Sequence, residues 1–136
     1  MISGIHHLGI AVKSVDAALA LFQGVLGGQL GTYRAETEQW LSQFVNLGDL
    51  RLELMEPRGQ GGIIERFLVG RGEGVHHFAL KVDRVADLVA ACEEAGLMVV
   101  NKRFQGPCMI GAFIHPRSAF GVLVELTEGV RGIDLP

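Results

Sequence analysis

The feature that most restricts the possible folds of this chain is a short sequence motif that occurs twice, at His6–Val12 and at His76–Val82. Both copies begin with a pair of histidines and continue with apolar residues, and they start 70 positions apart in a chain of 136 residues. Each copy is followed by an apolar segment with a central glutamate, and these two residues, Glu53 and Glu125, are 72 positions apart. The chain is therefore expected to fold from two related halves that each supply histidine and glutamate.

The order of the expected elements is repeated as well. In the first half we expect a strand at about 3–12, a helix at 15–26 with Ser14 as its N-cap, and strands near 29–34, 40–47 and 50–56. In the second half we expect a strand at 75–82, a helix at 84–95 that starts from Asp83, and strands near 97–103, 110–115 and 121–127. This predicts one domain over 1–136, with β-α-β-β-β repeats at about 1–57 and 75–136. The connection at about 58–74 has a short helical piece near 63–68.

The bulk composition excludes several classes of protein. A hydrophobic fraction of 49% and a charged fraction of 20% are typical of a soluble globular chain. A net charge of −3 and the lack of a basic stripe argue against nucleic-acid binding. No apolar run reaches the ~18 residues of a membrane span, and no leader is recognised, so we expect a cytoplasmic protein. Cys92 and Cys108 predict no disulfide framework, and Cys92 is expected in the core.

Strand alternation selects one histidine from each pair. Neighbouring side chains of a strand face opposite sides, so His6 and His76 each share a face with the large apolar residues of the same motif. This face is expected to pack against the helix, so both residues are predicted to be packed or hydrogen-bonded there. His7 and His77 share the other face with small neighbours. Only these two are expected to point into a site.

The glutamates follow the same alternation. Leucines flank Glu53 on the helix side, and Val124 and Leu126 flank Glu125 in the same way. An interior carboxylate costs several kcal/mol unless it is paired or binds a metal, so both residues require a partner. If the two sheets curl toward one another around a pseudo-twofold axis, these glutamates converge with His7 and His77.

Two imidazoles and two carboxylates form a donor set suited to one divalent metal ion, with Co, Ni, Zn, Fe or Mn left open. Four protein ligands leave two positions of an octahedral shell for substrate oxygens. Single histidines and glutamates on strands are usually not ligands, but the coincidence across a repeat favours the set. His115, beside Pro116, is expected to be structural. Arg58, Arg66 and Arg71 lie in the connection, where they either meet an anionic ligand or are solvated.

These residues resemble the vicinal oxygen chelate superfamily, which includes glyoxalases, bleomycin-resistance proteins and dioxygenases, and the resemblance covers essentially the whole chain. It implies an α+β fold in which two βαβββ repeats form a curved mixed-sheet half-barrel around a metal cleft. Within the superfamily, the chain resembles the methylmalonyl-CoA epimerases. The segments that carry this second resemblance are His7–Lys13, Asn46–Gly48, Leu52–Pro57, Glu65–Leu68, Arg71–His77, His115–Ser118 and Gly121–Leu126.

The resemblance implies metal ligation by His7, Glu53, His77 and Glu125. It also implies a 1,1-proton transfer at the α-carbon of a small-molecule substrate, an acyl-CoA thioester of the 2-substituted malonyl type, with Glu125 as a catalytic acid–base. A homodimer is implied as well. A second acid is expected on the strand 40–47, where the nearest position holds Gln43. Because an amide does not exchange protons at neutral pH, Gln43 is assigned to substrate binding.

Other readings stay open. The first alternative is glyoxalase I, whose bacterial forms have a similar set of ligands and which would isomerise a hemithioacetal. The segments His115–Ser118 and Arg71–Gly74 argue against it. An extradiol dioxygenase would use two histidines and one glutamate, so Glu53 argues against that class. A small-molecule-binding protein without catalysis would not need the full ligand set. Gln105–Met109 is more apolar than the glycine-rich loop usual there, which leaves the acyl group and the use of CoA undecided.

Overall fold

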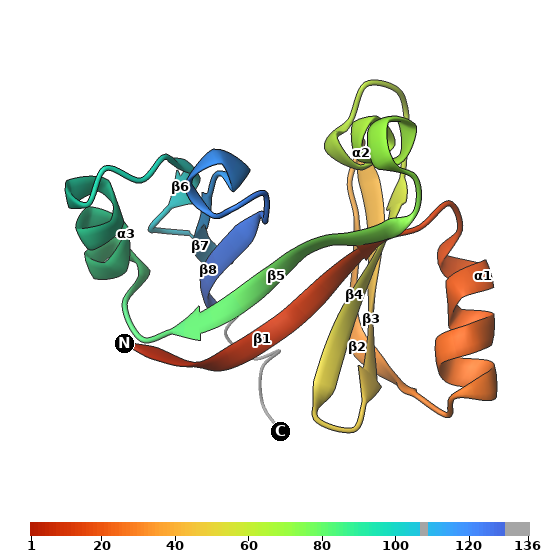
Figure 1. Ribbon diagram of the computed structural model, residues 1–136. Helices are drawn as coiled ribbons and strands as arrows, with labels where there is room; N and C mark the ends of the chain where they lie inside the picture. The colour runs from red at the N-terminus through yellow and green to blue at the C-terminus, as the bar shows by residue number, and fades with distance from the viewer. Residues whose placement is uncertain (107–108, 130–136) are drawn as a thin grey trace. The chain divides into compact units, whose positions relative to one another are not determined.

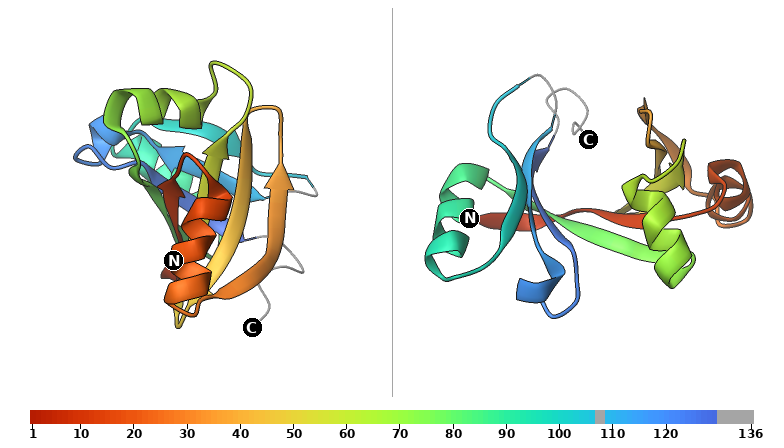
Figure 2. Two further views of the ribbon diagram at one scale, coloured as in Figure 1. Left: turned by 90° about the vertical axis from the view of Figure 1, so that its right-hand side faces the viewer. Right: turned by 90° about the horizontal axis from the view of Figure 1, so that it is seen from above.

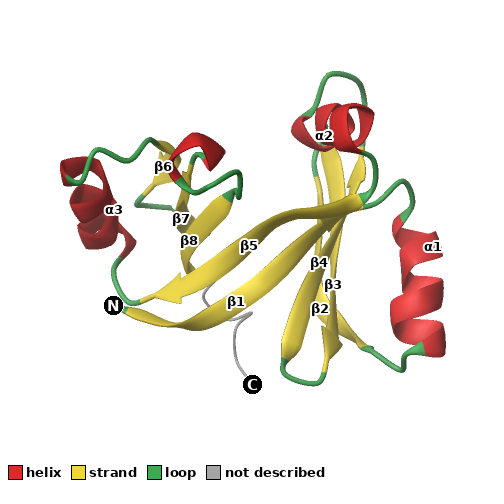
Figure 3. Cartoon of the chain, in the orientation of Figure 1, coloured by secondary structure: helices red, strands yellow, loops and turns green. Residues whose placement is uncertain are grey.

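The computed structural model describes residues 1–106 and 109–129 (Figures 1 and 3). Its elements are β1 (Ile2–Ala11), α1 (Val15–Leu19), the π-helical turn η1 (Ala20–Val25), β2 (Gln29–Glu36), β3 (Trp40–Leu47), β4 (Leu50–Pro57), α2 (Ile63–Arg71), β5 (Gly74–Val82), α3 (Val85–Glu94), β6 (Val99–Arg103), β7 (Ile110–Ile114), the 3-10 helix η2 (Pro116–Ser118) and β8 (Val124–Gly129). The expected β-α-β-β-β order is confirmed in both halves. The fold class, α+β with mixed parallel and antiparallel pairing, is confirmed as well.

The chain divides into two compact units. One consists of His7–His76 and is called the first unit here; the other contains Met1–His6 together with the chain from His77 onward and is called the second unit. β1 and β5 therefore contribute residues to both. In the second unit the start of β1 lies along the end of β5, where Ser3 Oγ donates to the Lys81 carbonyl oxygen at 3.2 Å. The unit boundaries thus differ from the expected repeat boundaries, while the half-barrel around a cleft stays a prediction.

In the first unit the strand order is β2-β3-β4-β1, with β1 parallel to β4 and β3 antiparallel to it. α1 lies along one face of these strands (Figures 1 and 2). Its Val15 packs into a buried cluster with Val12, Leu41, Val45, Leu52 and Leu54, and Leu8 and Ile10 of β1 join this cluster. The face of β1 predicted to pack against the helix is therefore confirmed. A smaller cluster of Ala11, Met55 and Ile64 forms under α2.

The second unit has the order β5-β8-β7-β6, with β5 parallel to β8. Its buried cluster joins α3 to the strands and consists of Val82, Val85, Val89, Cys92, Ala112, Val124 and Leu126, with Phe78 and Leu80 packed against it. The predicted core position of Cys92 is confirmed. Burial raises the pKa of its thiol, and the neighbouring Glu93 carboxylate adds to this effect.

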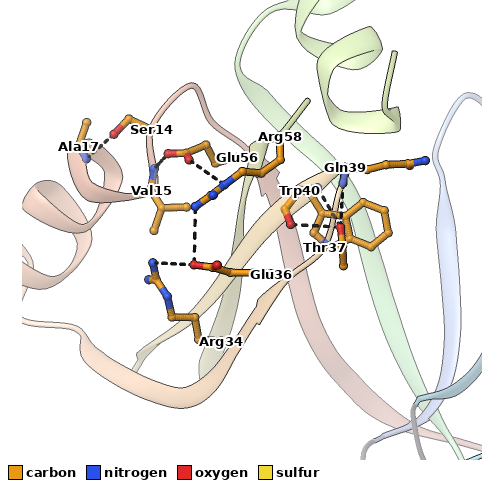
Figure 4. A network of polar contacts seen from close by, with 10 residues as sticks. All are labelled: Ser14, Val15, Ala17, Arg34, Glu36, Thr37, Gln39, Trp40, Glu56 and Arg58. Carbon is orange, nitrogen blue, oxygen red and sulfur yellow. Dashed lines mark hydrogen bonds and ion pairs between the residues drawn. The ribbon is translucent and has the colours of Figure 1, made fainter. Parts of the chain in front are cut away.

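Helices α1 and α3 begin with the same hydrogen bond to a glutamate side chain, which sequence analysis did not anticipate. The first helical N–H of α1, at Val15, donates to Glu56 Oε1 at 2.9 Å, and that of α3, at Val85, donates to Glu128 Oε1 at 2.8 Å (Figure 4 shows the first). Glu56 and Glu128 are 72 positions apart, as Glu53 and Glu125 are. A carboxylate from the last strand of each repeat therefore satisfies an N–H group that the helix leaves unpaired.

The helix starts and ends differ from expectation in two places, at the start of α3 and at the end of α1. Ser14 is the N-cap of α1 as predicted, because its Oγ accepts from Ala17 N at 3.1 Å. Asp83 does not cap α3; Arg84 holds that position without a side-chain hydrogen bond, and Glu128 supplies the acceptor instead. The α-helix expected to reach residue 26 changes to η1 after Leu19.

The last strand is shorter than predicted. β8 begins at Val124 rather than at 121, because η2 and a turn with positive φ at Phe120 and Gly121 occupy the preceding residues. His115 is structural, as predicted, since its Nδ1 accepts from Arg117 N at 3.0 Å and caps η2. Among the described residues, no helix combines the length and the apolar character needed to span a bilayer.

Candidate functional site

The first unit brings His7 and Glu53 together. They lie on the adjacent parallel strands β1 and β4, where Glu53 is in register with Gly9, two positions beyond His7. His7 Nε2 lies 3.5 Å from Glu53 Oε1, and the side chains are 2% and 13% exposed. Two polar groups with so little exposure stabilise each other or a shared ligand, because little water reaches them.

The second unit repeats this arrangement with His77 and Glu125. β5 and β8 are parallel neighbours, and Glu125 is in register with Ala79, two positions beyond His77. His77 Nε2 lies 3.3 Å from Glu125 Oε2, and both side chains are 3% exposed. The two units therefore carry the same His–Glu pair, in the same register and with the same imidazole nitrogen directed at the carboxylate.

An aromatic ring completes each pair. Phe44 of β3 is paired directly with Glu53, and its ring centroid lies 5.3 Å from that of His7. Phe113 of β7 is paired directly with Glu125, and its centroid lies 6.2 Å from the His77 ring. Each ring packs beside an imidazole and keeps water from it. Sequence analysis missed both phenylalanines, because the register of antiparallel neighbours was needed to place them.

The chemistry and spacing of each pair fit a divalent metal ion. Nitrogen and oxygen ligands lie about 2.0–2.2 Å from Zn²⁺ or a similar ion, so two ligands at 90–110° are roughly 3.0–3.5 Å apart. The His–Glu separations of 3.5 and 3.3 Å fall in or at the edge of this range. Neutral imidazole with carboxylate suits the first-row divalent metals. Each pair therefore provides two ligand atoms of the type and spacing that such an ion requires.

Further side chains surround the pair in the first unit. The Tyr33 ring lies 5.0 Å from the Phe44 ring, and the Arg51 guanidinium carbon lies 5.7 Å from the Phe44 centroid. Strand register places Ser42 on this face too, because it is paired with Met55, two positions beyond Glu53 on β4. This face of the first unit therefore also presents the rings of Phe44 and Tyr33, the Arg51 guanidinium and the Ser42 hydroxyl group.

Gln43 lies on the opposite face of β3. It is paired with Leu54 in the core under α1, and it is 2% exposed. Its Nε2 donates to the carbonyl oxygens of Gly31 at 3.0 Å and Phe44 at 2.9 Å, which ties down the irregular part of β2. A contact between Gln43 and a substrate remains a prediction that this geometry does not support, because strand alternation turns its side chain away from His7.

The remaining candidate residues have local structural partners. The His76 ring makes an edge contact with Phe67 at 5.0 Å, consistent with its predicted packing role. Arg58 lies 3.6 Å from Glu36 and 3.9 Å from Glu56 (Figure 4). Arg66 donates to the Gly61 carbonyl oxygen, and Arg71 stacks over Phe67. In the segment Gln105–Met109, residues 107 and 108 lie outside the described residues, and with them Cys108.

Comparison with known proteins places these features in a family context. Residues 6–111 match a family model described as the glyoxalase/bleomycin resistance protein/dioxygenase superfamily. The chain is 32% identical over 136 residues to an ethylmalonyl-CoA/methylmalonyl-CoA epimerase of Cereibacter sphaeroides, covering 94% of this chain and 99% of the relative. It is 32% identical over 132 residues to the mitochondrial methylmalonyl-CoA epimerase of Bos taurus, covering 91% and 73%. The crystal structure of methylmalonyl-CoA epimerase from Mycobacterium tuberculosis matches with a TM-score of 0.83 at 26% identity, covering 93% of this chain and 87% of that one.

Proposed function

Because the chain belongs to the glyoxalase/bleomycin resistance/dioxygenase superfamily, we propose that it is an epimerase acting on a 2-substituted malonyl-CoA such as methylmalonyl-CoA. The reaction is a 1,1-proton transfer at the carbon between the thioester and the carboxylate. The observation that carries this proposal is the His–Glu pair that occurs in both units in the same register. Two curated relatives that match along most of this chain, those of Cereibacter sphaeroides and Bos taurus, are epimerases of this substrate class.

We propose that His7, Glu53, His77 and Glu125 together hold one divalent metal ion, with Co, Ni, Zn, Fe and Mn as the candidates. The fit of each His–Glu pair to nitrogen and oxygen ligation supports this assignment. When bound, such an ion supplies a Lewis acid that stabilises negative charge developing on the oxygen atoms of the substrate. The low exposure of these side chains strengthens every electrostatic interaction at the site, because little water competes.

Glu125 is assigned the proton transfer. Its carboxylate lies in a strand whose neighbours Val124 and Leu126 are buried, so little bulk water competes with the α-carbon for this base. Phe113, paired with Glu125 across the sheet, restricts water further. Inversion requires a proton to arrive on the other face of the planar carbon. Solvent-derived deuterium in the product reports this arrival, whichever group delivers the proton.

The reaction is tested by nuclear magnetic resonance in D₂O. With metal-loaded enzyme, the α-proton signal of methylmalonyl-CoA is expected to disappear, while the methyl doublet collapses to a singlet. The adduct of methylglyoxal and glutathione serves as the competing substrate, because glyoxalase I acts on it. No exchange into methylmalonyl-CoA, or faster turnover of the glutathione adduct, would reject the proposed function.

The metal assignment is tested separately by elemental analysis of the purified protein. We expect about one divalent ion per chain, and loss of most of it in both His7→Ala and His77→Ala, since each variant removes one ligand. His76→Ala is the matched control, because its ring packs against Phe67 and metal content is expected to stay unchanged. Two ions per chain, or normal content in His77→Ala, would show that the two pairs do not share an ion.

The homodimer and the cytoplasmic location expected from the sequence remain proposals that rest on the resemblance. Light scattering is expected to give about twice the chain mass of 14.7 kDa. A mass of one chain at micromolar concentration would reject the dimer and would leave the assigned chemistry untouched, since both His–Glu pairs lie within a single chain.

A further inference from the structure

Ser42 carries a buried hydroxyl group that makes no hydrogen bond within the described part of the fold. Its side chain is 1% exposed, and Oγ has no hydrogen-bond partner among the residues that the structure describes. Buried hydroxyl groups are nearly always paired, because an unpaired one loses its bonds to water and gains nothing in return. The chain therefore retains a polar atom at the cost of stability, which is typical of a group that meets a ligand.

The position of Ser42 connects it with the site. Ser42 is paired with Met55 on β4 and with Ala35 on β2, and the pair two positions along β3 is Phe44 with Glu53. Because directly paired residues share a face, Ser42 faces the same side as Glu53. The diagonal separation of two such residues is roughly 7–8 Å. One substrate bound on this face can therefore lie against both residues.

The surroundings of Ser42 indicate what it binds. Its cross-strand neighbours Ala35 and Met55 are apolar, so a hydrogen bond made there is not weakened by competing polar groups. A serine hydroxyl donates one hydrogen bond and is not an acid at neutral pH, which excludes proton transfer. The acceptor that gains most from a donor in such a place is an anion.

We propose that Ser42 Oγ donates a hydrogen bond to the free carboxylate of the acyl-CoA substrate and selects substrates that carry this group. This inference rests on the proposed function. A carboxylate has two oxygen atoms and about four acceptor sites, so it can accept this bond while it makes other contacts. Ser42 is therefore a substrate-binding residue on the face of His7 and Glu53. It is one position from Gln43, the residue that sequence analysis assigns to substrate binding.

The test compares Ser42→Ala with the wild-type protein. Loss of a hydrogen bond to a charged group is expected to lower kcat/KM for methylmalonyl-CoA about 10- to 100-fold. Calorimetry should show weaker binding of malonyl-CoA by a similar factor and unchanged binding of propionyl-CoA, which lacks the carboxylate. The melting temperature should stay equal or rise, because no internal bond is lost.

Thr127 provides the matched stability control. It is also fully buried, but Oγ1 donates to the Ile110 carbonyl oxygen at 3.2 Å and accepts from Gly129 N at 2.9 Å. Thr127→Val is therefore expected to lower the melting temperature where Ser42→Ala does not. A hydroxyl group with a purely structural role would make the two variants behave alike.

Three results overturn the inference. They are a lower melting temperature of Ser42→Ala with unchanged kinetics, equal weakening of malonyl-CoA and propionyl-CoA binding, and unchanged binding of both. If wild-type protein fails to exchange the α-proton, the proposed function fails, and the two binding measurements still decide the role of Ser42. The failure of one proposal is therefore distinguishable from the failure of the other.

Discussion

Replacement of Glu56 tests whether a carboxylate from β4 starts helix α1. Glu56 Oε1 accepts from Val15 N at 2.9 Å, and its Oε2 lies 3.9 Å from Arg58 Nε (Figure 4). The Glu56 side chain is 23% exposed, so water replaces this bond only in part. Ser14 already satisfies Ala17 N, so Glu56 supplies an acceptor that no other cap provides.

The expected loss of stability follows from three contributions, namely the hydrogen bond, the charge at the helix N-terminus and the ion pair. A hydrogen bond to a charged group contributes about 1.5–3 kcal/mol, and a charge at a helix N-terminus about 0.3–1 kcal/mol. The ion pair with Arg58 adds less than about 1 kcal/mol, because Arg58 is 43% exposed. After allowance for partial exposure, Glu56→Ala is expected to lower the free energy of unfolding by roughly 2 kcal/mol. Glu56→Gln keeps an acceptor and is expected to cost roughly 0.5–1 kcal/mol.

Urea unfolding followed by circular dichroism measures these changes, provided that the dependence of the unfolding free energy on urea concentration is the same for all variants. A thermal scan should show a melting temperature lower by roughly 5–10 °C for Glu56→Ala. Arg58→Ala separates the ion pair from the cap. Glu128→Ala, the counterpart in the second repeat, is expected to cost less than Glu56→Ala, because Glu128 is exposed and its bond competes with water. A loss below 0.5 kcal/mol for Glu56→Ala, or a loss equal to that of Arg58→Ala, would refute the capping argument.

Three further predictions concern the proposed base, two glycines and the buried cysteine. Glu125→Gln should retain metal by elemental analysis and lower the deuterium-exchange rate about 10²- to 10⁴-fold, because an amide cannot carry the proton; normal exchange would exclude Glu125 as the base. Gly28→Ala should lower the melting temperature, since the added Cβ would lie 2.6 Å from the Phe22 carbonyl oxygen. Gly70→Ala in α2 should raise it, because the added Cβ meets nothing within 4 Å and alanine favours the helix. Equal changes in melting temperature for the two variants would contradict this. In a variant with Cys108→Ser, thiol labelling of Cys92 by a disulfide reagent should follow unfolding, because burial and a raised pKa suppress the thiolate; rapid labelling of the folded protein would disprove it.

The face on which a side chain lies follows from local alternation along a strand, whereas its match to a residue of a relative depends on the exact register. Selection of His7 and His77 over their neighbours used only the alternation of side chains along a strand, which is a local property. The prediction that Gln43 binds substrate used the resemblance of the strand 40–47 to that of the methylmalonyl-CoA epimerases, and a shift of one residue exchanges the two faces of a strand. The structure pairs Gln43 with Leu54 in the core and turns Ser42 to the side of Glu53.

The amino-acid sequence by itself determined the duplication, the order of the elements in each repeat and the face on which each histidine lies. These follow from periodicity and from short-range preferences, which any strand or helix expresses alone. Only the tertiary structure decided that Phe44 and Phe113 stand beside the imidazoles and that Glu56 and Glu128 start the helices. Such contacts join residues distant in the chain, and they depend on strand register, which is set by the packing of the whole core.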